Sequence, residues 1–240
     1  MPNDLWVSSV LTRPRSYLVY SLRNTLFWIV RGCLAGLPFS VALLIVDASA
    51  MDVRSPFTQY AVVVSGHHGV YLGDGLVITA NHVAGEQPSV QMAGRTMPAE
   101  VLKRGNGDVD LALLSIRQHL PKWLNYPKLK LCAEHPQAGD AVSVVLPEGA
   151  LPSEVLSLFD LRVPVPAGLQ KDLIRYLPAA DSGTPVFSTK QACLAGLISH
   201  KLTEAQTTTI NGHQVVEKHD VAFYFQPASE IRSFLLQVPH

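Results

Sequence analysis

Residues 69–83 read GVYLGDGLVITANHV, and this stretch decides the fold that we expect. Two runs rich in β-branched and aromatic residues, 69–72 and 76–79, favour strands. Residues 73–75, Gly-Asp-Gly, supply the turn of a β-hairpin between them. His82 follows the second strand after only two residues, so we expect its imidazole at a strand end. A histidine there, taken alone, is most often structural.

Two further segments carry the polar groups that a nucleophilic hydrolase needs. Residues 108–114 read DVDLALL, which puts Asp110 directly before a buried strand, and residues 181–186 read DSGTPV, with Ser182 in a turn. A serine hydroxyl attacks a carbonyl when an imidazole takes its proton and a carboxylate holds that imidazole in the right tautomer. Asp108 is the rival carboxylate, but the apolar run favours Asp110. Each residue alone also fits a capping or turn role, whereas together they predict a catalytic triad.

The chain after residue 50 is a succession of short strand candidates separated by turn formers, which is typical of an all-β protein. The candidates are residues 60–65, 69–72, 76–79, 96–102, 111–116, 141–146, 156–165, 185–188, 193–199 and 221–225. A polar, proline-containing stretch, 117–127, divides them into two groups. We therefore predict two packed six-stranded antiparallel β-barrels, 51–128 and 129–240. The pattern of residues 228–237 predicts a C-terminal helix.

This division distributes the predicted triad over both barrels. His82 and Asp110 belong to the first barrel, and Ser182 belongs to the second. The three side chains can meet only at the interface, where a cleft would bind substrate.

The first 50 residues differ in composition from the rest. Residues 26–46 are almost entirely apolar apart from Arg31, and Ala-Ser-Ala follows at 48–50. A basic flank, an apolar core over 33–46 and a small-x-small site form the layout of a secretory signal that is cleaved after Ala50. Alternatively, 26–46 is long enough to be an uncleaved membrane anchor and tether. Either segment would export the protein, to the periplasm or beyond the cell; a buried core helix fits poorly.

The remaining composition excludes several classes of function. After residue 50 the chain has 15 basic and 17 acidic residues, so no basic footprint for nucleic acid is visible. The histidines form no HExxH motif and the cysteines no CxxC motif, so we expect no metal and no cofactor. Cys132 and Cys193 would be able to pair in an oxidising compartment, but their spacing alone does not establish a disulfide.

Taken in order, these segments resemble a trypsin-like, chymotrypsin-fold serine protease, most similar in pattern to bacterial Deg-type protease domains. The resemblance covers residues 60–237. It rests on the hairpin and histidine segment 69–83, the aspartate segment 109–114, the nucleophile loop 180–187, the strand 194–199 and the closing strand and helix 221–237. It implies chymotrypsin-like barrels and protein or peptide substrates. Nothing follows in the sequence to match the C-terminal PDZ module of Deg-type proteins, so we expect that module to be absent.

The resemblance also implies a role for each residue of the site. His82 would be general base and then general acid, Asp110 would orient it, and Ser182 would form an acyl-enzyme. The backbone N–H groups of Ala180 and Ser182 would form the oxyanion hole. The family usually has glycine where Ala180 stands, and an alanine at positive φ costs about 1 to 2 kcal/mol. We therefore expect a strained hole, or one that forms only when substrate binds.

Asp181 is a second departure from the family. Relatives that are activated by cleavage pair this aspartate with a new N-terminal amine, and Deg-type relatives usually carry asparagine. No corresponding start sequence precedes Tyr60. We therefore expect a lysine, an arginine or the amine of Met51 as the partner of Asp181.

The substrate-binding residues follow from register with the family. Tyr176 would lie near the base of the primary specificity pocket, and Ser199, His200 and Lys201 would lie along its wall. No carboxylate is expected at that base, which argues against a preference for arginine or lysine. His200 and Lys201 either favour an acidic side chain or face solvent.

The sequence thus predicts an exported serine endopeptidase that works through a His-Asp-Ser triad. The alternative is a catalytically weak or inactive binding protein on the same fold, and the alanine at position 180 favours it. An α/β-hydrolase esterase is disfavoured because that class has the chain order Ser, Asp, His.

Overall fold

The computed structural model describes residues 51–124, 126–157, 172–210 and 213–237, with side chains described outside 206–215. The predicted signal or anchor segment, 1–50, lies outside the described residues. Within the described ranges, no helix is long and apolar enough to cross a membrane.

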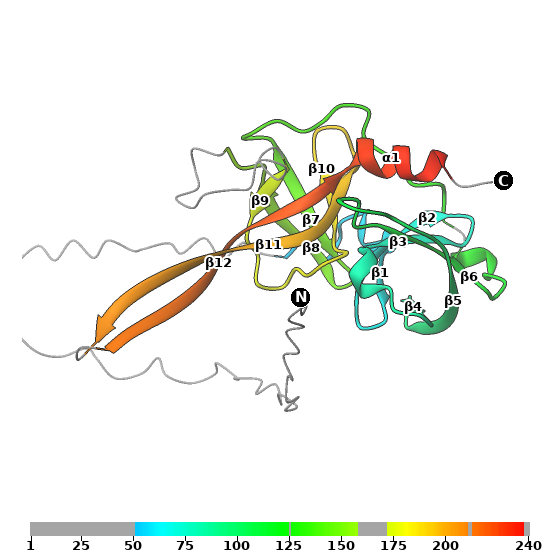
Figure 1. Ribbon diagram of the computed structural model, residues 1–240. Coiled ribbons are helices and arrows are strands. Elements are labelled where there is room, and N and C mark those ends of the chain that lie inside the picture. Colours follow the sequence, from blue (N-terminus) through cyan, green and yellow to red (C-terminus); the bar gives the residue numbers. More distant parts are fainter. Residues whose placement is uncertain (1–50, 125, 158–171, 211–212, 238–240) are drawn as a thin grey trace, which may run out of the picture. The chain divides into compact units, whose positions relative to one another are not determined.

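The first sheet is a closed antiparallel barrel with strand order β1-β2-β3-β6-β5-β4 (Figure 1). Its strands are β1 (Ala61–Val64), β2 (His67–Gly73), β3 (Leu76–Thr79), β4 (Ser89–Met92), β5 (Arg95–Arg104) and β6 (Ala112–Ile116). Three short 3-10 helices accompany it, η1 (Thr58–Tyr60), η2 (Asn81–Val83) and η3 (Lys122–Leu124). Tyr71, Val77 and Leu114 are fully buried in its core. The predicted barrel is confirmed, and β4 is a strand that the sequence pattern did not indicate.

The predicted hairpin turn joins β2 to β3. Tyr71 pairs with Val77, and the turn residues Asp74 and Gly75 both have positive φ, 53° and 77°. Two successive positive φ values are the requirement of a type I′ hairpin turn, which is why an aspartate followed by glycine suits this position.

The second sheet is also antiparallel and has six strands, in the order β8-β7-β10-β11-β12-β9. They are β7 (Ala141–Leu146), β8 (Gly149–Glu154), β9 (Leu173–Arg175), β10 (Pro185–Ser188), β11 (Cys193–Ile210) and β12 (His213–Pro227). Its edges meet at one bridge, between Val155 after β8 and Ile174 in β9. Of the strand predicted at 156–165, residues 158–165 lie outside the described residues. The sequence pattern did not indicate β8 or β9.

Strands β11 and β12 are much longer than predicted. Beyond the body of the second sheet they pair only with each other and project as a two-stranded ribbon (Figure 1). The sequence predicted strands only at 193–199 and 221–225, because those segments carry the apolar residues of the core.

The two sheets share a hydrophobic cluster with the C-terminal helix α1 (Ala228–Leu236). Ile231 and Phe234 of α1 are buried in it together with Leu113 of the first barrel and Leu197 of the second sheet. Burial of each such side chain contributes about 1.5 to 3 kcal/mol. The cluster therefore fixes the two sheets against each other, and with them the groups on either side of the site.

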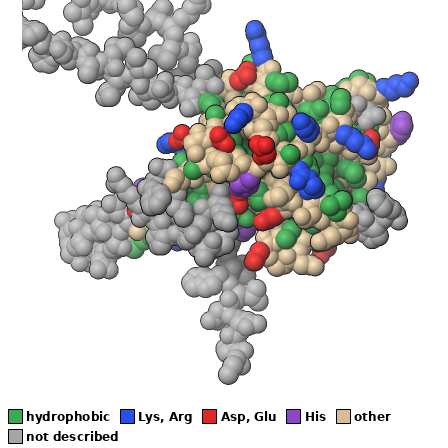
Figure 2. Space-filling model, turned by 90° about the horizontal axis from the view of Figure 1, so that it is seen from above, with side chains coloured by type: hydrophobic (Ala, Val, Ile, Leu, Met, Phe, Trp, Pro, Cys, Tyr) green, Lys and Arg blue, Asp and Glu red, His purple; other side chains and the backbone are tan. Residues whose placement is uncertain are grey.

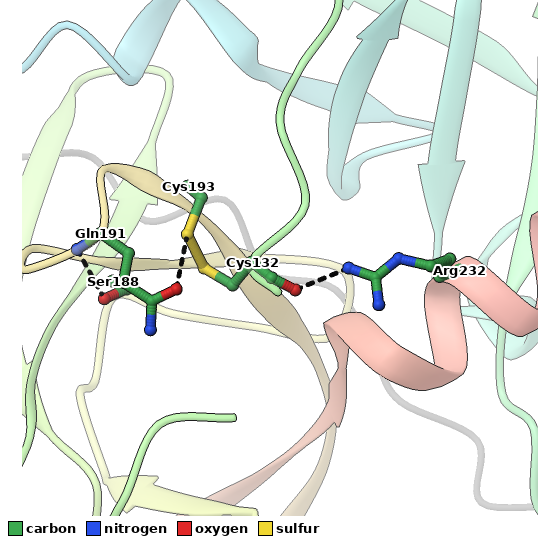
Figure 3. Close-up of a disulfide and its surroundings, with 5 residues drawn as sticks. All are labelled: Cys132, Ser188, Gln191, Cys193 and Arg232. Atoms are coloured by element: carbon green, nitrogen blue, oxygen red, sulfur yellow. Dashed lines mark hydrogen bonds between the residues drawn. A yellow bond between two sulfur atoms is a disulfide. The ribbon is translucent and has the colours of Figure 1, made fainter. Parts of the chain in front are cut away.

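A disulfide ties the second sheet together. Cys132 and Cys193, 61 residues apart, are bonded, and their Cα atoms are 5.1 Å apart. Figure 3 shows Arg232 of α1 donating a hydrogen bond to the carbonyl of Cys132, at 2.7 Å. Cys132 is thus bonded to the start of β11 and hydrogen-bonded to α1. On the face seen in Figure 2, basic and acidic side chains are mixed, with hydrophobic side chains between them.

Candidate active site

A cleft of about 990 Å³ contains all three residues of the predicted triad. The first barrel contributes His82 and Asp110 to its lining. The second sheet and its loops contribute Ser182, Ser199, His200 and Lys201. Residues that are 72 positions apart in the chain, Asp110 and Ser182, are thereby brought to one hollow.

His82 lies in η2, directly after β3, and Asp110 fixes it in two ways. The backbone N–H of His82 donates to Oδ1 of Asp110 at 3.1 Å, and Nδ1 lies 2.8 Å from Oδ2. An ionised carboxylate only accepts hydrogen bonds, so Nδ1 carries a proton, and in the neutral ring Nε2 keeps its lone pair. The side chain of His82 is 48% exposed, which leaves it open to a substrate in the cleft.

Asp110 is the better shielded partner, since only 13% of its side chain is exposed. Burial by itself raises the pKa of Asp110, but hydrogen bonds from Ser199 and His82 and the charge of His82 together hold that pKa below its usual value. The hydroxyl of Ser199 donates to Oδ2 at 2.5 Å. The rival Asp108 lines the same cleft, and its carbonyl accepts a hydrogen bond from Gln226. The carboxylate that contacts the imidazole is therefore that of Asp110.

Ser182 faces the cleft, but its hydroxyl is engaged elsewhere. It donates to the backbone carbonyl of Ser199 at 3.0 Å, and within the described part of the chain no hydrogen bond joins Ser182 to His82. The hydroxyl of Ser182 is therefore directed to Ser199 and not to the imidazole of His82.

The two predicted donors of the oxyanion hole are also engaged. The N–H of Ser182 donates to Oδ1 of Asp181 at 2.7 Å, and the N–H of Ala180 donates to the carbonyl of Leu177 at 3.0 Å. Ala180 is not among the described non-glycine residues with positive φ. The expected strain at Ala180 is therefore absent, because its peptide is turned toward Leu177.

The partner of Asp181 is neither a basic side chain of the expected kind nor the amine of Met51. Oδ2 of Asp181 lies 3.1 Å from Nδ1 of His67 in β2. Burial by itself raises the pKa of Asp181; the N–H of Ser182, the His67 hydrogen bond and the charges of His67 and His68 outweigh it and lower that pKa. His67 was not predicted as a site residue, because nothing in the sequence links two residues 114 positions apart.

Gly183 shows why this loop needs a glycine after the serine. Its φ is +87°, and a Cβ at this position would lie 1.9 Å from the carbonyl oxygen of His68. The loop therefore packs directly against β2. Thr184 continues this contact, with Oγ1 2.8 Å from Nδ1 of His68.

The predicted substrate-binding residues divide into two groups. Ser199, His200 and Lys201 line the cleft, whereas Tyr176 is not part of its lining. Tyr176 packs on Phe223, with ring centroids 5.1 Å apart. Its role near the base of a specificity pocket stays a prediction.

A carboxylate, that of Asp220, lies beside Tyr176. Asp220 accepts hydrogen bonds from Thr203, at 2.8 Å, and from Tyr176, and it lies 3.4 Å from Nζ of Lys201. The hydrogen bond from Thr203 is the largest cause of a lowered pKa at Asp220. Because Asp220 partly neutralises Lys201, this lysine is less suited to select an acidic substrate. The pairing of β11 with β12 brings these residues together.

Within the described ranges, no group of three or more His, Cys, Asp or Glu side chains is arranged to hold a metal ion.

Solved structures with the same fold are serine proteases. The Rv3671c protease of M. tuberculosis, in its inactive form, is 18% identical with a TM-score of 0.56, and covers 78% of this chain and 93% of its own. The active form of the same protease is 18% identical with a TM-score of 0.55, and the match covers 78% of this chain and 85% of the protease. Kallikrein-related peptidase 10 is 16% identical with a TM-score of 0.55, and the match covers 79% of this chain and 98% of the peptidase. No protein-family model and no curated protein sequence matches the chain. The structural matches show the chymotrypsin fold.

Proposed function

We propose that this protein is an exported serine endopeptidase that hydrolyses peptide bonds in proteins or peptides. The observation that carries the proposal is the pair of hydrogen bonds from His82 to Asp110, with Ser182 lining the same cleft. A structural histidine would not need an open ring beside a shielded carboxylate, whereas a general base needs both.

The reaction follows from the positions of the protons. Nε2 of His82 takes the proton of Ser182 Oγ as that oxygen attacks the carbonyl carbon of the substrate. His82 then gives this proton to the departing amine, and the C–N bond breaks to leave an acyl-enzyme. A water molecule then gives a proton to His82 as its oxygen attacks the acyl carbon. The ester bond to Ser182 Oγ breaks, the carboxylic acid product leaves, and His82 returns the proton to Oγ. Asp110 stays ionised throughout and stabilises the imidazolium.

The arrangement of the nucleophile loop is a resting one. For catalysis, the Ser182 hydroxyl has to leave the carbonyl of Ser199, and the amides of Ser182 and Ala180 have to leave Asp181 and Leu177. Each hydrogen bond of this kind contributes about 0.5 to 1.5 kcal/mol net. Together these bonds contribute a few kcal/mol to the stability of the resting arrangement. The binding of substrate, whose carbonyl oxygen becomes the new acceptor of the two amides, has to offset this free energy.

The engaged amides favour a second candidate function. If Ala180 and Asp181 hold the loop permanently in this arrangement, the oxyanion hole never forms and the cleft binds a peptide without cleaving it. The protein would then be a catalytically weak or inactive binding protein.

Labelling by a fluorophosphonate probe separates the two functions. A protease should be labelled on Ser182, and Ser182→Ala should abolish labelling. Ser233→Ala is the matched control, because the Ser233 hydroxyl donates to the Ser229 carbonyl within α1, away from the cleft lining. Cleavage of a peptide library by the same preparation would identify the substrate. An unlabelled wild-type chain that binds peptides would support the second function.

Export is the second part of the proposal. The disulfide between Cys132 and Cys193 supports an oxidising compartment. Mass spectrometry of the extracytoplasmic fraction should find a chain that begins at Met51. An intact N-terminus in the membrane fraction would instead favour a tether through residues 26–46.

A further inference from the structure

The strand that carries Ser199 has a bulge at that residue. Ile198 pairs with Phe225 and His200 with Tyr224, so Ser199 is the extra residue in β11. In a regular strand, successive side chains point to opposite faces. The bulge removes that alternation, and the Ser199 hydroxyl lies 2.7 Å from Nδ1 of His200.

The direction of each hydrogen bond around Ser199 follows from its partners. Ser199 Oγ lies 2.5 Å from Oδ2 of Asp110, and an ionised carboxylate only accepts. The single hydroxyl proton of Ser199 therefore points to Asp110, and Nδ1 of His200 must donate to Ser199 Oγ. The chain of hydrogen bonds runs from His200 through Ser199 to the oxygen of Asp110 that His82 also contacts.

We propose that His200 is a positioning residue for the triad. The inference rests on the proposed function. Ser199 is buried and 2% exposed, and its hydroxyl can hold Asp110 only in one rotamer. The Nδ1–H of His200 fixes that rotamer, so it fixes the carboxylate that orients His82. Donation from Nδ1 persists whether His200 is neutral or protonated, so this role needs no titration.

The placement of His200 suits such a role better than a role in stability. Its side chain is exposed at the cleft, with ring centroids 6.1 Å from His82 and 6.2 Å from Tyr224. Replacing an exposed ring removes little buried surface, so variants should fold. The hydrogen bond to Ser199 is the contact that links His200 to the buried carboxylate.

Two variants separate the effect of the Nδ1–H donor of His200 from the effect of its ring. His200→Phe keeps a planar ring and removes the donor, whereas His200→Asn places an amide nitrogen near the position of Nδ1 and restores it. We expect His200→Phe to lower kcat and the rate of fluorophosphonate labelling by about tenfold, and His200→Asn to stay within about twofold of wild type. Both should keep the unfolding temperature of the wild type. His219→Phe, on the exposed ribbon, should change neither rate.

A double variant tests whether His200 acts through Ser199. In a Ser199→Ala background, His200→Phe should cause no further loss, because the link is already broken. An additive loss would overturn the inference, as would failure of His200→Asn to restore the rate. Since His200 lines the cleft, a change in KM alone would also overturn it.

A readout without turnover separates this inference from the proposed function. In the full chain, the proton NMR signal of the His82 Nδ1–H should shift and exchange faster with water in His200→Phe, and return in His200→Asn. If the wild-type chain is not labelled, the proposed function fails. The NMR signal of the His82 Nδ1–H then tests the role of His200 without any measurement of activity. An unchanged signal in His200→Phe would overturn the inference in either case.

Discussion

The carboxylate of Asp181 accepts a hydrogen bond from the backbone N–H of Ser182, at 2.7 Å. That amide is one of the two that an oxyanion hole requires. The same carboxylate is held from the other side by His67. On the proposed function, Asp181 therefore keeps the oxyanion hole closed in the resting arrangement, and His67 stabilises Asp181 there.

Removing the His67 side chain should favour the arrangement of the nucleophile loop in which the amides of Ser182 and Ala180 are free to bind the oxyanion. We expect His67→Ala to raise the rate of fluorophosphonate labelling by about two- to fivefold, because a half-exposed pair of this kind contributes about 0.2 to 1 kcal/mol to the resting state. His219→Ala, on the exposed ribbon, is the control and should leave the rate unchanged. Slower labelling of His67→Ala would mean that His67 supports the active arrangement instead.

The triad should act as a unit. Ser182→Ala and His82→Ala should each lower kcat/KM by about 10³-fold or more, and Asp110→Asn should be severe because it leaves the imidazole in the wrong tautomer. The measurement is peptide hydrolysis, with circular dichroism to check folding. Asp108→Asn is the matched control. A harmless Asp110→Asn beside an inactive Asp108→Asn would refute the choice of carboxylate.

Glycine at position 180 should speed catalysis. Ala180 is unstrained in the resting loop, so its cost arises only when the peptide turns toward the oxyanion at positive φ. Ala180→Gly should remove about 1 to 2 kcal/mol of that cost and raise kcat/KM by up to about tenfold, with Ser182 still required. Lower activity would show that the alanine methyl makes a contact needed for turnover, and activity at background in both forms would favour the binding protein.

Loss of the disulfide should destabilise the second sheet. Opening the loop between Cys132 and Cys193 frees a chain segment of 61 residues in the unfolded state. We expect the double variant Cys132→Ala, Cys193→Ala to lose about 2 to 4 kcal/mol of unfolding free energy, measured by urea denaturation. Wild-type protein in which the disulfide has been reduced should lose a similar amount of unfolding free energy. Equal stability of oxidised and reduced protein would contradict the prediction.

Stability should fall in acid. The pKa values of Asp110 and Asp181 lie below the ordinary value in the folded state, so each contributes stability that is complete above about pH 3.9 and is lost as the pH falls through the folded pKa. Asp110 should contribute more, because Asp181 is 47% exposed and screened by solvent. Urea denaturation between about pH 5 and pH 2 should show a shallower loss in Asp110→Asn than in wild type. If the unfolding free energies of wild type and Asp110→Asn fell equally with pH, the contribution assigned to Asp110 would be contradicted.

Those features that depend on neighbouring residues could be predicted from the sequence. The hairpin predicted over residues 69–79 is present because an Asp-Gly turn between two strand-forming runs has few alternatives. Strands β3, β7 and β10 have the predicted bounds, and α1 ends one residue early. His82 and Asp110 were recognisable because each stands at the end of a buried strand.

The state of the site, by contrast, depends on contacts between residues that are distant in the chain. The contact between His67 and Asp181 joins residues 114 positions apart, and the bulge at Ser199 depends on how β11 pairs with β12. Neither follows from local preference. His67 reaches Asp181 only when the two sheets pack against each other, and the bulge depends on the pairing of two strands within the second sheet. The sequence therefore predicted that His82, Asp110 and Ser182 would meet in one cleft. The direction in which the Ser182 hydroxyl and amide point was decided by the acceptors that packing placed beside them, the carbonyl of Ser199 and the carboxylate of Asp181.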